Sequence, residues 1–123
     1  AAGNASWVTS VRDEGNFVTD GPFLIKLGNE LLAIWSSFSK DGYLEAIARS
    51  DNGKIDGKWT IDDNLLFEKD GGHGMIFKTF SGKLLMSVHS HKDTPQYGYL
   101  RKPRFFEVDL SGDKLKIIGE YNP

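Results

Sequence analysis

Two stretches decide how this chain folds, Asp20-Gly-Pro-Phe-Leu-Ile-Lys-Leu-Gly-Asn-Glu-Leu-Leu-Ala-Ile-Trp-Ser-Ser37 and His73-Gly-Met-Ile-Phe-Lys-Thr-Phe-Ser-Gly-Lys-Leu-Leu-Met-Ser-Val-His-Ser90. They align without a gap at a shift of 53 residues, which sets a Leu-Leu pair on a Leu-Leu pair. Each stretch holds two apolar runs around a short turn, Gly28-Asn29 in the first and Ser81-Gly82 in the second. This pattern predicts a two-residue β-hairpin in each stretch.

Further short apolar runs follow each hairpin, at 43–49 and 59–61 after the first and at 104–110 and 114–118 after the second. Two unrelated hairpins with a Gly turn would align equally well, but they would not share these following runs. A repeat of about fifty residues with four short strands is typical of a β-propeller blade. We therefore predict an all-β fold of antiparallel four-stranded blades, with a leading strand at 5–12, one blade at 18–68 and another at 72–120.

The composition excludes several classes of protein. The chain has 123 residues, of which 39% are hydrophobic and 26% charged, as in ordinary globular domains rather than disordered chains. A net charge of −2 without a basic cluster argues against a nucleic-acid partner. The absence of Cys excludes disulfides and thiolate sites, and no apolar run is long enough to cross a membrane. The chain starts at Ala1 without Met or a signal peptide, so we expect a processed or excised piece of a longer protein.

The repeat also predicts a candidate site. In the ungapped alignment Asp20 and His73 occupy the same place, directly before the Gly that opens the first strand of each unit. The first strand of a propeller blade lines the central channel, so we expect this carboxylate and this imidazole to face one pocket. Asp20 in Thr-Asp-Gly-Pro is also a common turn residue.

Two further histidines, His89 and His91, lie on the same face of a strand by alternation. Together with His73 they could form a three-His metal site, although no carboxylate motif accompanies them. Positions at the rim of the pocket are the alternative for both.

Several motifs together resemble one enzyme family: residues 19–23 (TDGPF), 71–77 (GGHGMIF), 48–51 (ARSD) running on to 57–59 (GKW), and 104–108 (RFFEV). In this combination the sequence resembles the later blades of glycoside hydrolase family 43 over most of its length. The family consists of five-bladed β-propellers that act on arabinose- and xylose-containing polysaccharides. The resemblance implies that the chain holds about two of five blades and is the C-terminal part of such a protein.

The resemblance implies cleavage of α-L-arabinofuranosyl or β-D-xylosyl linkages in plant polysaccharides with inversion. In the family one Asp is the general base, a second Asp tunes a pKa, and a Glu is the general acid. Asp20 stands at the position of the acid, although its side chain is one methylene shorter than the usual Glu. No segment matches the first two blades, so we expect the base to be missing and the isolated chain to be inactive. The alternative is a non-catalytic carbohydrate-binding or structural propeller module.

The residues expected to bind substrate are His73, Trp35, Phe23 and Arg104. For Trp35 a place in the core, and for Arg104 a solvated basic edge, are the alternatives. No cofactor is required, and a calcium ion on the propeller axis, with His73 in its environment, stays open. The expected partner is an oligo- or polysaccharide, self-association through open blade edges is expected, and the substrate class implies a secreted or periplasmic protein.

Overall fold

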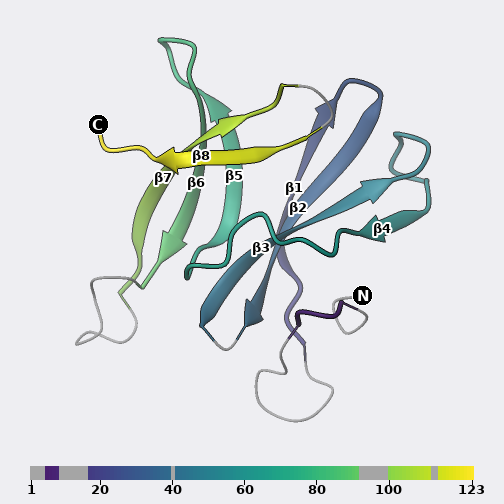
Figure 1. Ribbon diagram of the computed structural model, residues 1–123, viewed down its shortest axis with the longest axis horizontal. Helices are drawn as coiled ribbons and strands as arrows, with labels where there is room; N and C mark the ends of the chain where they lie inside the picture. The colour runs from purple at the N-terminus through teal and green to yellow at the C-terminus, as the bar shows by residue number, and fades with distance from the viewer. Residues whose placement is uncertain (1–4, 9–16, 40, 92–99, 112–113) are drawn as a thin grey trace.

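The computed structural model describes residues 5–8, 17–39, 41–91, 100–111 and 114–123. Within these ranges the chain forms eight β-strands and no helix, arranged as two antiparallel four-stranded sheets (Figure 1). Within each sheet, every strand pairs with the next one along the chain. The predicted all-β architecture of four-stranded blades is confirmed, and no helix of the described residues is long and apolar enough to span a membrane.

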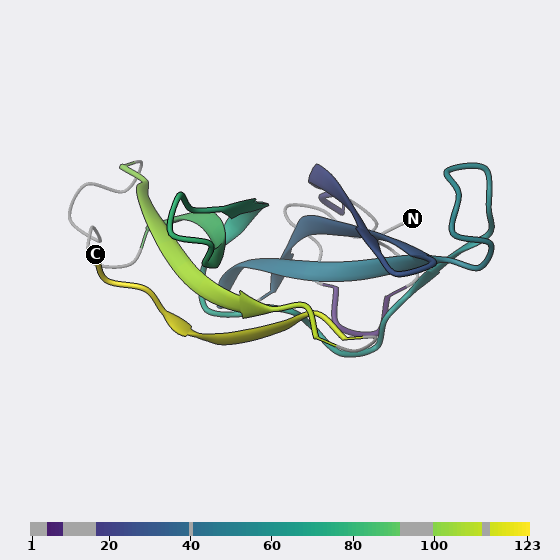
Figure 2. The same cartoon turned by 90° about the horizontal axis from the view of Figure 1, so that it is seen from above.

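The first sheet, called blade 1, consists of β1 (Asp20–Leu27), β2 (Glu30–Ser39), β3 (Gly42–Ser50) and β4 (Trp59–Ile61). The second, called blade 2, consists of β5 (Gly72–Lys78), β6 (Leu84–Ser90), β7 (Lys102–Asp109) and β8 (Lys116–Glu120). The two blades lie side by side, as a second view from above shows (Figure 2). Strand β5, the first of blade 2, contacts β1, β2 and β3 of blade 1.

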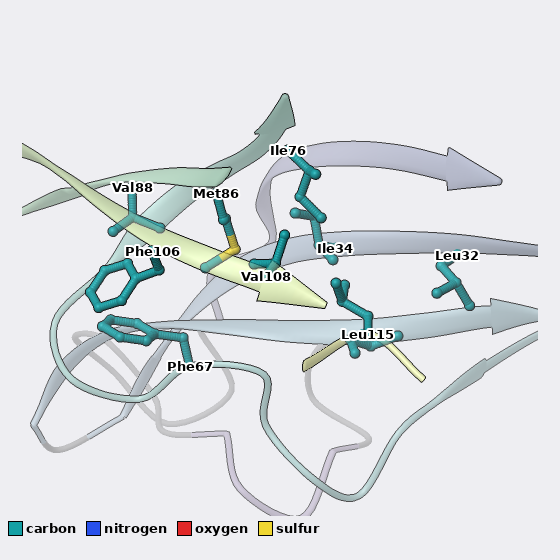
Figure 3. Close-up of a cluster of buried hydrophobic side chains, with 10 residues drawn as sticks. Leu32, Ile34, Phe67, Ile76, Met86, Val88, Phe106, Val108 and Leu115 are labelled. Carbon is teal, nitrogen blue, oxygen red and sulfur yellow. The ribbon is translucent and has the colours of Figure 1, made fainter. Parts of the chain in front are cut away.

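The main hydrophobic core lies between the two blades (Figure 3). Leu32 and Ile34 of β2 are fully buried and meet Met86 of β6 and Phe106 of β7 in this core. Phe67 comes from the connection between the blades, and its ring centroid lies 4.7 Å from that of Phe106. Removal of this apolar surface from water is the main force that holds one blade against the other.

A second apolar cluster covers the opposite face of blade 1 around Trp35, Leu44, Ala46 and Ala48. The indole of Trp7 packs on Trp35 at 5.5 Å between ring centroids, and its Nε1 donates a hydrogen bond to the Asp62 carbonyl. Residues 5–8 form a turn, in which the Val8 amide donates to the Ala5 carbonyl, and not the beginning of the strand expected at 5–12. The rest of that expected strand, 9–12, lies outside the described residues.

The two hairpins differ in their turns. Leu27 pairs directly with Glu30 around Gly28-Asn29, as predicted. In blade 2 the Thr79 amide donates to the Lys83 carbonyl, and the Gly82 amide donates to the Thr79 carbonyl. The second turn therefore has three residues, 80–82, and the prediction of a two-residue turn at Ser81-Gly82 was wrong. A residue with positive φ at the end of a three-residue loop is a common hairpin solution, and Gly82 has a φ of 90°.

The extra turn residue corrects the alignment of the inner strands. The Phe23–Ile34 pair of blade 1 corresponds to the Met75–Ser87 pair of blade 2. The shift is therefore 52 residues between the first strands of the two blades and 53 residues between their second strands. His73 therefore stands where Gly21 stands, and the expectation that it matches Asp20 was wrong by one residue. The backbone agrees, because Gly21 and His73 have φ values of 53° and 57°.

Candidate functional site

Asp20 and His73 lie together at the beginnings of β1 and β5. The distance from His73 Nδ1 to Asp20 Oδ2 is 3.9 Å, and both side chains are more than half exposed. Each strand has an irregular register just after its first residue, between Asp20 and Phe23 and between Gly72 and Met75. Such bulges redirect side chains and are frequent beside functional sites. The expected convergence of a carboxylate and an imidazole is therefore present, although the two residues are not equivalent in the repeat.

The ring of His73 rests directly on Gly21. A Cβ atom at Gly21 would lie 2.8 Å from Cγ of His73, closer than such atoms approach one another. Gly21 also has a left-handed φ, which glycine adopts without steric cost. Close approach and backbone conformation thus both require glycine beneath the imidazole.

A buried carboxylate, Glu45 of β3, lies against Gly74, the residue that follows His73. Its Oε1 accepts hydrogen bonds from the Gly74 amide at 2.6 Å and from Ser36 Oγ at 2.7 Å. Burial raises the pKa of Glu45 to about 7, against the effect of these two hydrogen bonds, and the charge of Asp20 raises it further. Sequence reasoning missed Glu45, but a single charged residue inside the apolar run at 43–48 was a signal that could have found it.

His89 and His91 border the same end of the blades around Tyr43. The Tyr43 ring lies 4.7 Å from the His89 ring and 5.9 Å from the His91 ring. His91 is held by Asp70, whose Oδ2 accepts from the His91 amide at 2.7 Å and whose Oδ1 lies 3.3 Å from Nδ1. Burial lowers the pKa of His89, as do the nearby charges of Arg101 and the other two histidines.

These histidines do not form a metal site. Successive ring centroids from His73 through His89 to His91 are 6.4 Å apart. In the part of the chain that the structure describes, no three His, Asp or Glu side chains are placed to hold a metal ion. Calcium requires six to eight oxygen ligands, and Asp20 is the one carboxylate that the described residues place in ion-pair contact with His73. The residues present therefore do not fit a calcium ion by themselves.

The other three predicted substrate-binding residues pack against other parts of the protein. Trp35 is 5% exposed within the second apolar cluster, and Phe23 packs against the core between the blades. Trp35 therefore has no face open for a sugar, and Phe23 is partly buried against the core. Arg104 forms two hydrogen bonds with Glu120, at 2.8 and 2.9 Å, and its guanidinium lies 4.9 Å from the Phe106 ring centroid. These contacts tie β7 to β8.

Comparison with known proteins gives matches among solved structures only. No protein-family profile and no curated protein sequence matches the chain. The crystal structure of an endo-arabinase from Bacteroides thetaiotaomicron superimposes with a TM-score of 0.74 and 33% sequence identity over 88% of this chain. An endo-1,4-β-xylanase from the same organism gives a TM-score of 0.71 and 25% identity over 83% of the chain.

A thermostable family-43 glycoside hydrolase has the same fold, with a TM-score of 0.73 and 21% identity over 89% of the chain. The chain spans 38% of the length of each of these three proteins. The likeness covers 83–89% of this chain in the three comparisons. The resemblance to glycoside hydrolase family 43 is therefore confirmed, and the chain carries two four-stranded blades of that family's β-propeller fold.

Proposed function

We propose that this chain forms the general-acid side of a glycosidase pocket. The complete pocket would cleave α-L-arabinofuranosyl or β-D-xylosyl linkages of plant polysaccharides with inversion at the anomeric carbon. The observation that carries the proposal is the exposed Asp20 carboxylate 3.9 Å from the His73 imidazole at the start of two inner strands. Similarity to an endo-arabinase and an endo-1,4-β-xylanase supports the substrate class.

In this role Asp20 protonates the leaving glycosidic oxygen, and His73 supports the carboxyl group and contacts the sugar. Inversion needs a second carboxylate roughly 6.5–9.5 Å from the acid, with a water molecule between the two. Glu45 is not suited to be this base, because its carboxyl group is buried and already accepts two hydrogen bonds. The base would come from a part of the propeller that the two blades do not include.

The acid role is tested by replacing Asp20 with Asn in a protein that carries this chain together with the remaining blades. General acid catalysis contributes about 100- to 10,000-fold to the rate, so kcat on arabinan or xylan should fall by about that factor. With a 4-nitrophenyl glycoside the loss should be much smaller, because nitrophenolate leaves without a proton. An equal loss on both substrates, or no loss on either, would contradict the assignment.

The isolated chain should bind the sugar without hydrolysing it. Arabino- and xylo-oligosaccharides titrated onto the ¹⁵N-labelled chain should shift the amide signals of Gly21, His73 and Gly74. Release of nitrophenol from an arabinofuranoside or xyloside should stay at the rate without protein. Turnover by the 123-residue chain would show that it holds its own base.

A second function, carbohydrate binding without catalysis, is favoured by one observation. Among the described residues, Asp20 is the carboxylate that forms an ion pair with His73, and a second exposed carboxylate is not seen in contact with the pair. Binding of arabino- and xylo-oligosaccharides by the completed propeller, without hydrolysis of arabinan or xylan, would favour this function. We also propose a secreted or periplasmic location, because polysaccharides of this class lie outside the cell; fractionation of the producing cells tests it.

A further inference from the structure

Two backbone amides near the start of β5 are bound by side chains of blade 1. The His73 amide donates to Ser36 Oγ at 2.5 Å, and the Gly74 amide donates to Glu45 Oε1 at 2.6 Å. The bulge between Gly72 and Met75 takes these two amides out of the regular ladder with β6. Buried amides need an acceptor, and here the acceptors come from across the blade boundary.

A glutamate such as Glu45 is unusual at a buried position whose side chain only packs against its neighbours. Its side chain is fully buried, and in the described structure its Oε2 has no hydrogen-bond partner. Burial of a carboxylate with an unpaired oxygen opposes folding. Ile47, two residues further along the same face of β3, shows that an apolar side chain packs there. A carboxylate at residue 45 is therefore explained by what its oxygen binds.

The Ser36–Glu45 pair is not a general feature of these blades. Ser36 pairs with both Asp20 and Glu45 in blade 1, and His89 pairs in the same way with Gly72 and Pro103 in blade 2. The two acceptors Ser36 and Glu45 of blade 1 therefore correspond to His89 and Pro103 of blade 2. The pair belongs to the one blade boundary at which His73 lies.

The backbone of Glu45 is itself fixed by the connection between the blades. Its amide donates to the Phe67 carbonyl at 2.8 Å, and its carbonyl accepts from the Leu66 amide at 2.9 Å. Because its backbone amide and carbonyl are both hydrogen-bonded, Glu45 presents its carboxylate from a fixed position. It can therefore hold a neighbouring segment in an energetically unfavourable backbone conformation. His73 has such a conformation, since positive φ is unfavourable for any residue with a Cβ.

We propose that Glu45 is a positioning residue that, together with Ser36, holds residues 73–74 in the left-handed bulge and so sets the His73 ring on Gly21 beside Asp20. The inference deepens the proposed function and rests on it only for the use made of His73. The placement of the ring is measurable without any substrate, so the two proposals can fail separately.

The experiment compares the 123-residue chain with its variants Glu45→Gln, Glu45→Leu, Ser36→Ala and, as a matched control, Glu107→Gln. Glu107 carries a partly exposed carboxylate on β7 that pairs with Lys83. NMR spectra of labelled protein report the nuclear Overhauser cross-peak between the His73 ring and the Gly21 α protons. The amide proton shift of Gly74 reports the hydrogen bond to residue 45.

The control and Glu45→Gln should keep the cross-peak and the Gly74 shift, because the Gln side-chain oxygen can still accept the Gly74 hydrogen bond. Glu45→Leu should lose the cross-peak and move the Gly74 amide proton upfield, while amide signals in β7 and β8 stay in place. Rescue by Gln but not Leu is a result that a space-filling role does not give. An unchanged cross-peak and Gly74 shift in Glu45→Leu would overturn the proposal.

If Glu45→Leu does not fold, Ser36→Ala decides the question, because it removes only the hydroxyl that accepts from the His73 amide. The His73 amide proton should then move upfield and the cross-peak should weaken; the absence of both changes overturns the proposal. Titration of the wild-type chain with arabino- and xylo-oligosaccharides is run on the same samples. A lack of any shift at Gly21 and Gly74 counts against the proposed function and leaves the result on His73 unaffected.

Discussion

At the scale of single residues, His73 is held in a conformation that most side chains avoid. Its φ of 57° lies in the left-handed region, where His, Asn and Asp are more frequent than other residues with a Cβ. The structure pairs this conformation with an exposed side chain next to a carboxylate. Strained backbone at such a position is frequent at functional sites, which agrees with the role proposed for His73.

Replacement of His73 tests this conformational cost. His73→Gly should stabilise the chain by about 1 kcal/mol, because glycine adopts positive φ freely, and His73→Val should destabilise it by about 1–2 kcal/mol. Thermal or urea unfolding of the two variants beside wild type measures both changes. Equal stability of the Gly and Val variants would contradict a left-handed residue 73.

Glu45 should make stability depend on pH. The pKa of Glu45 rises from 4.5 to about 7 in the folded chain because the carboxyl group is buried. The folded state therefore binds a proton that the unfolded state has released, and the resulting stability is fully present below pH 4.5 and lost as pH rises through 7. The loss amounts to about 3 kcal/mol between these limits.

Glu45→Gln should remove this dependence, since Gln resembles the protonated carboxyl group at every pH. The variant should match wild type near pH 4.5 and exceed it at pH 8, as measured by urea unfolding at a series of pH values. Glu107→Gln serves as the control, because its parent carboxylate is partly exposed. Parallel stability curves for Glu45→Gln and wild type would show that Glu45 titrates normally.

At the scale of elements, the loop after β3 is fastened to the hairpin between β1 and β2. Lys26 Nζ donates to the Gly53 carbonyl at 2.7 Å, and Gly53 has a φ of 68°. A Cβ at Gly53 would overlap the carbonyl oxygen of Asn29. Gly53 is therefore required twice, by its conformation and by the approach of the other loop.

Three alanine substitutions separate these two requirements. Gly53→Ala should destabilise the chain by about 3 kcal/mol, because it adds a steric overlap to the positive φ. Gly28→Ala should cost about 1 kcal/mol, since Gly28 has a φ of 58° but open space around it. Gly119→Ala, with neither feature, should be within about 0.5 kcal/mol of wild type. Urea unfolding should rank them in this order, and equal losses at Gly53 and Gly28 would exclude the overlap.

Much of the element pattern could be predicted from the sequence, because it depends on local features. Alternating apolar residues and Gly-containing turns predicted the hairpin strands, and the outer ends of the two hairpins lie within two residues of the predicted stretches 20–37 and 73–90. The length of the second turn could not be predicted, since the hydrogen bonds of Thr79 decide it. Because the second turn has one extra residue, His73 corresponds to Gly21 and not to Asp20.

The candidate site was only partly predictable for a different reason. Asp20 and His73 stand in recognisable motifs, so the repeat located both. Glu45 acquires its role from contact with Gly74, which lies 29 residues away in sequence. The pairing of Arg104 with Glu120 and the burial of Trp35 likewise depend on which blade face is covered. Contacts between distant segments are not encoded in the spacing of a local motif.

At the scale of the whole molecule, apolar side chains are left exposed on the outer face of each blade. Met75 and Phe77 of β5 are 52% and 40% exposed, and Phe77 packs edge-on against Phe105 at 6.1 Å. They alternate with Ile76, which faces the core between the blades. On blade 1 Leu24, 46% exposed, alternates in the same way with Phe23 and Ile25. In a propeller such faces are covered by the adjacent blades.

The isolated chain is therefore expected to associate with itself through these faces. Met75→Lys together with Phe77→Lys should shift it toward monomer, as measured by light scattering over a range of concentrations. Phe80→Lys is the control, because Phe80 is fully exposed at a turn tip, apart from both faces. A wild-type chain that is monomeric at every concentration would contradict the expectation.

The shared left-handed position of Gly21 and His73 bears on how such a molecule evolves after its blades have been duplicated. A glycine there leaves room at the axis, and its replacement by His, Asn or Asp adds a functional group without a change in the path of the strand. The change is open to only one of two adjoining blades, because the ring of His73 already occupies the space above Gly21. Duplication of a blade thus supplies equivalent left-handed positions, and steric exclusion between neighbouring blades limits how many of these positions can carry a functional side chain.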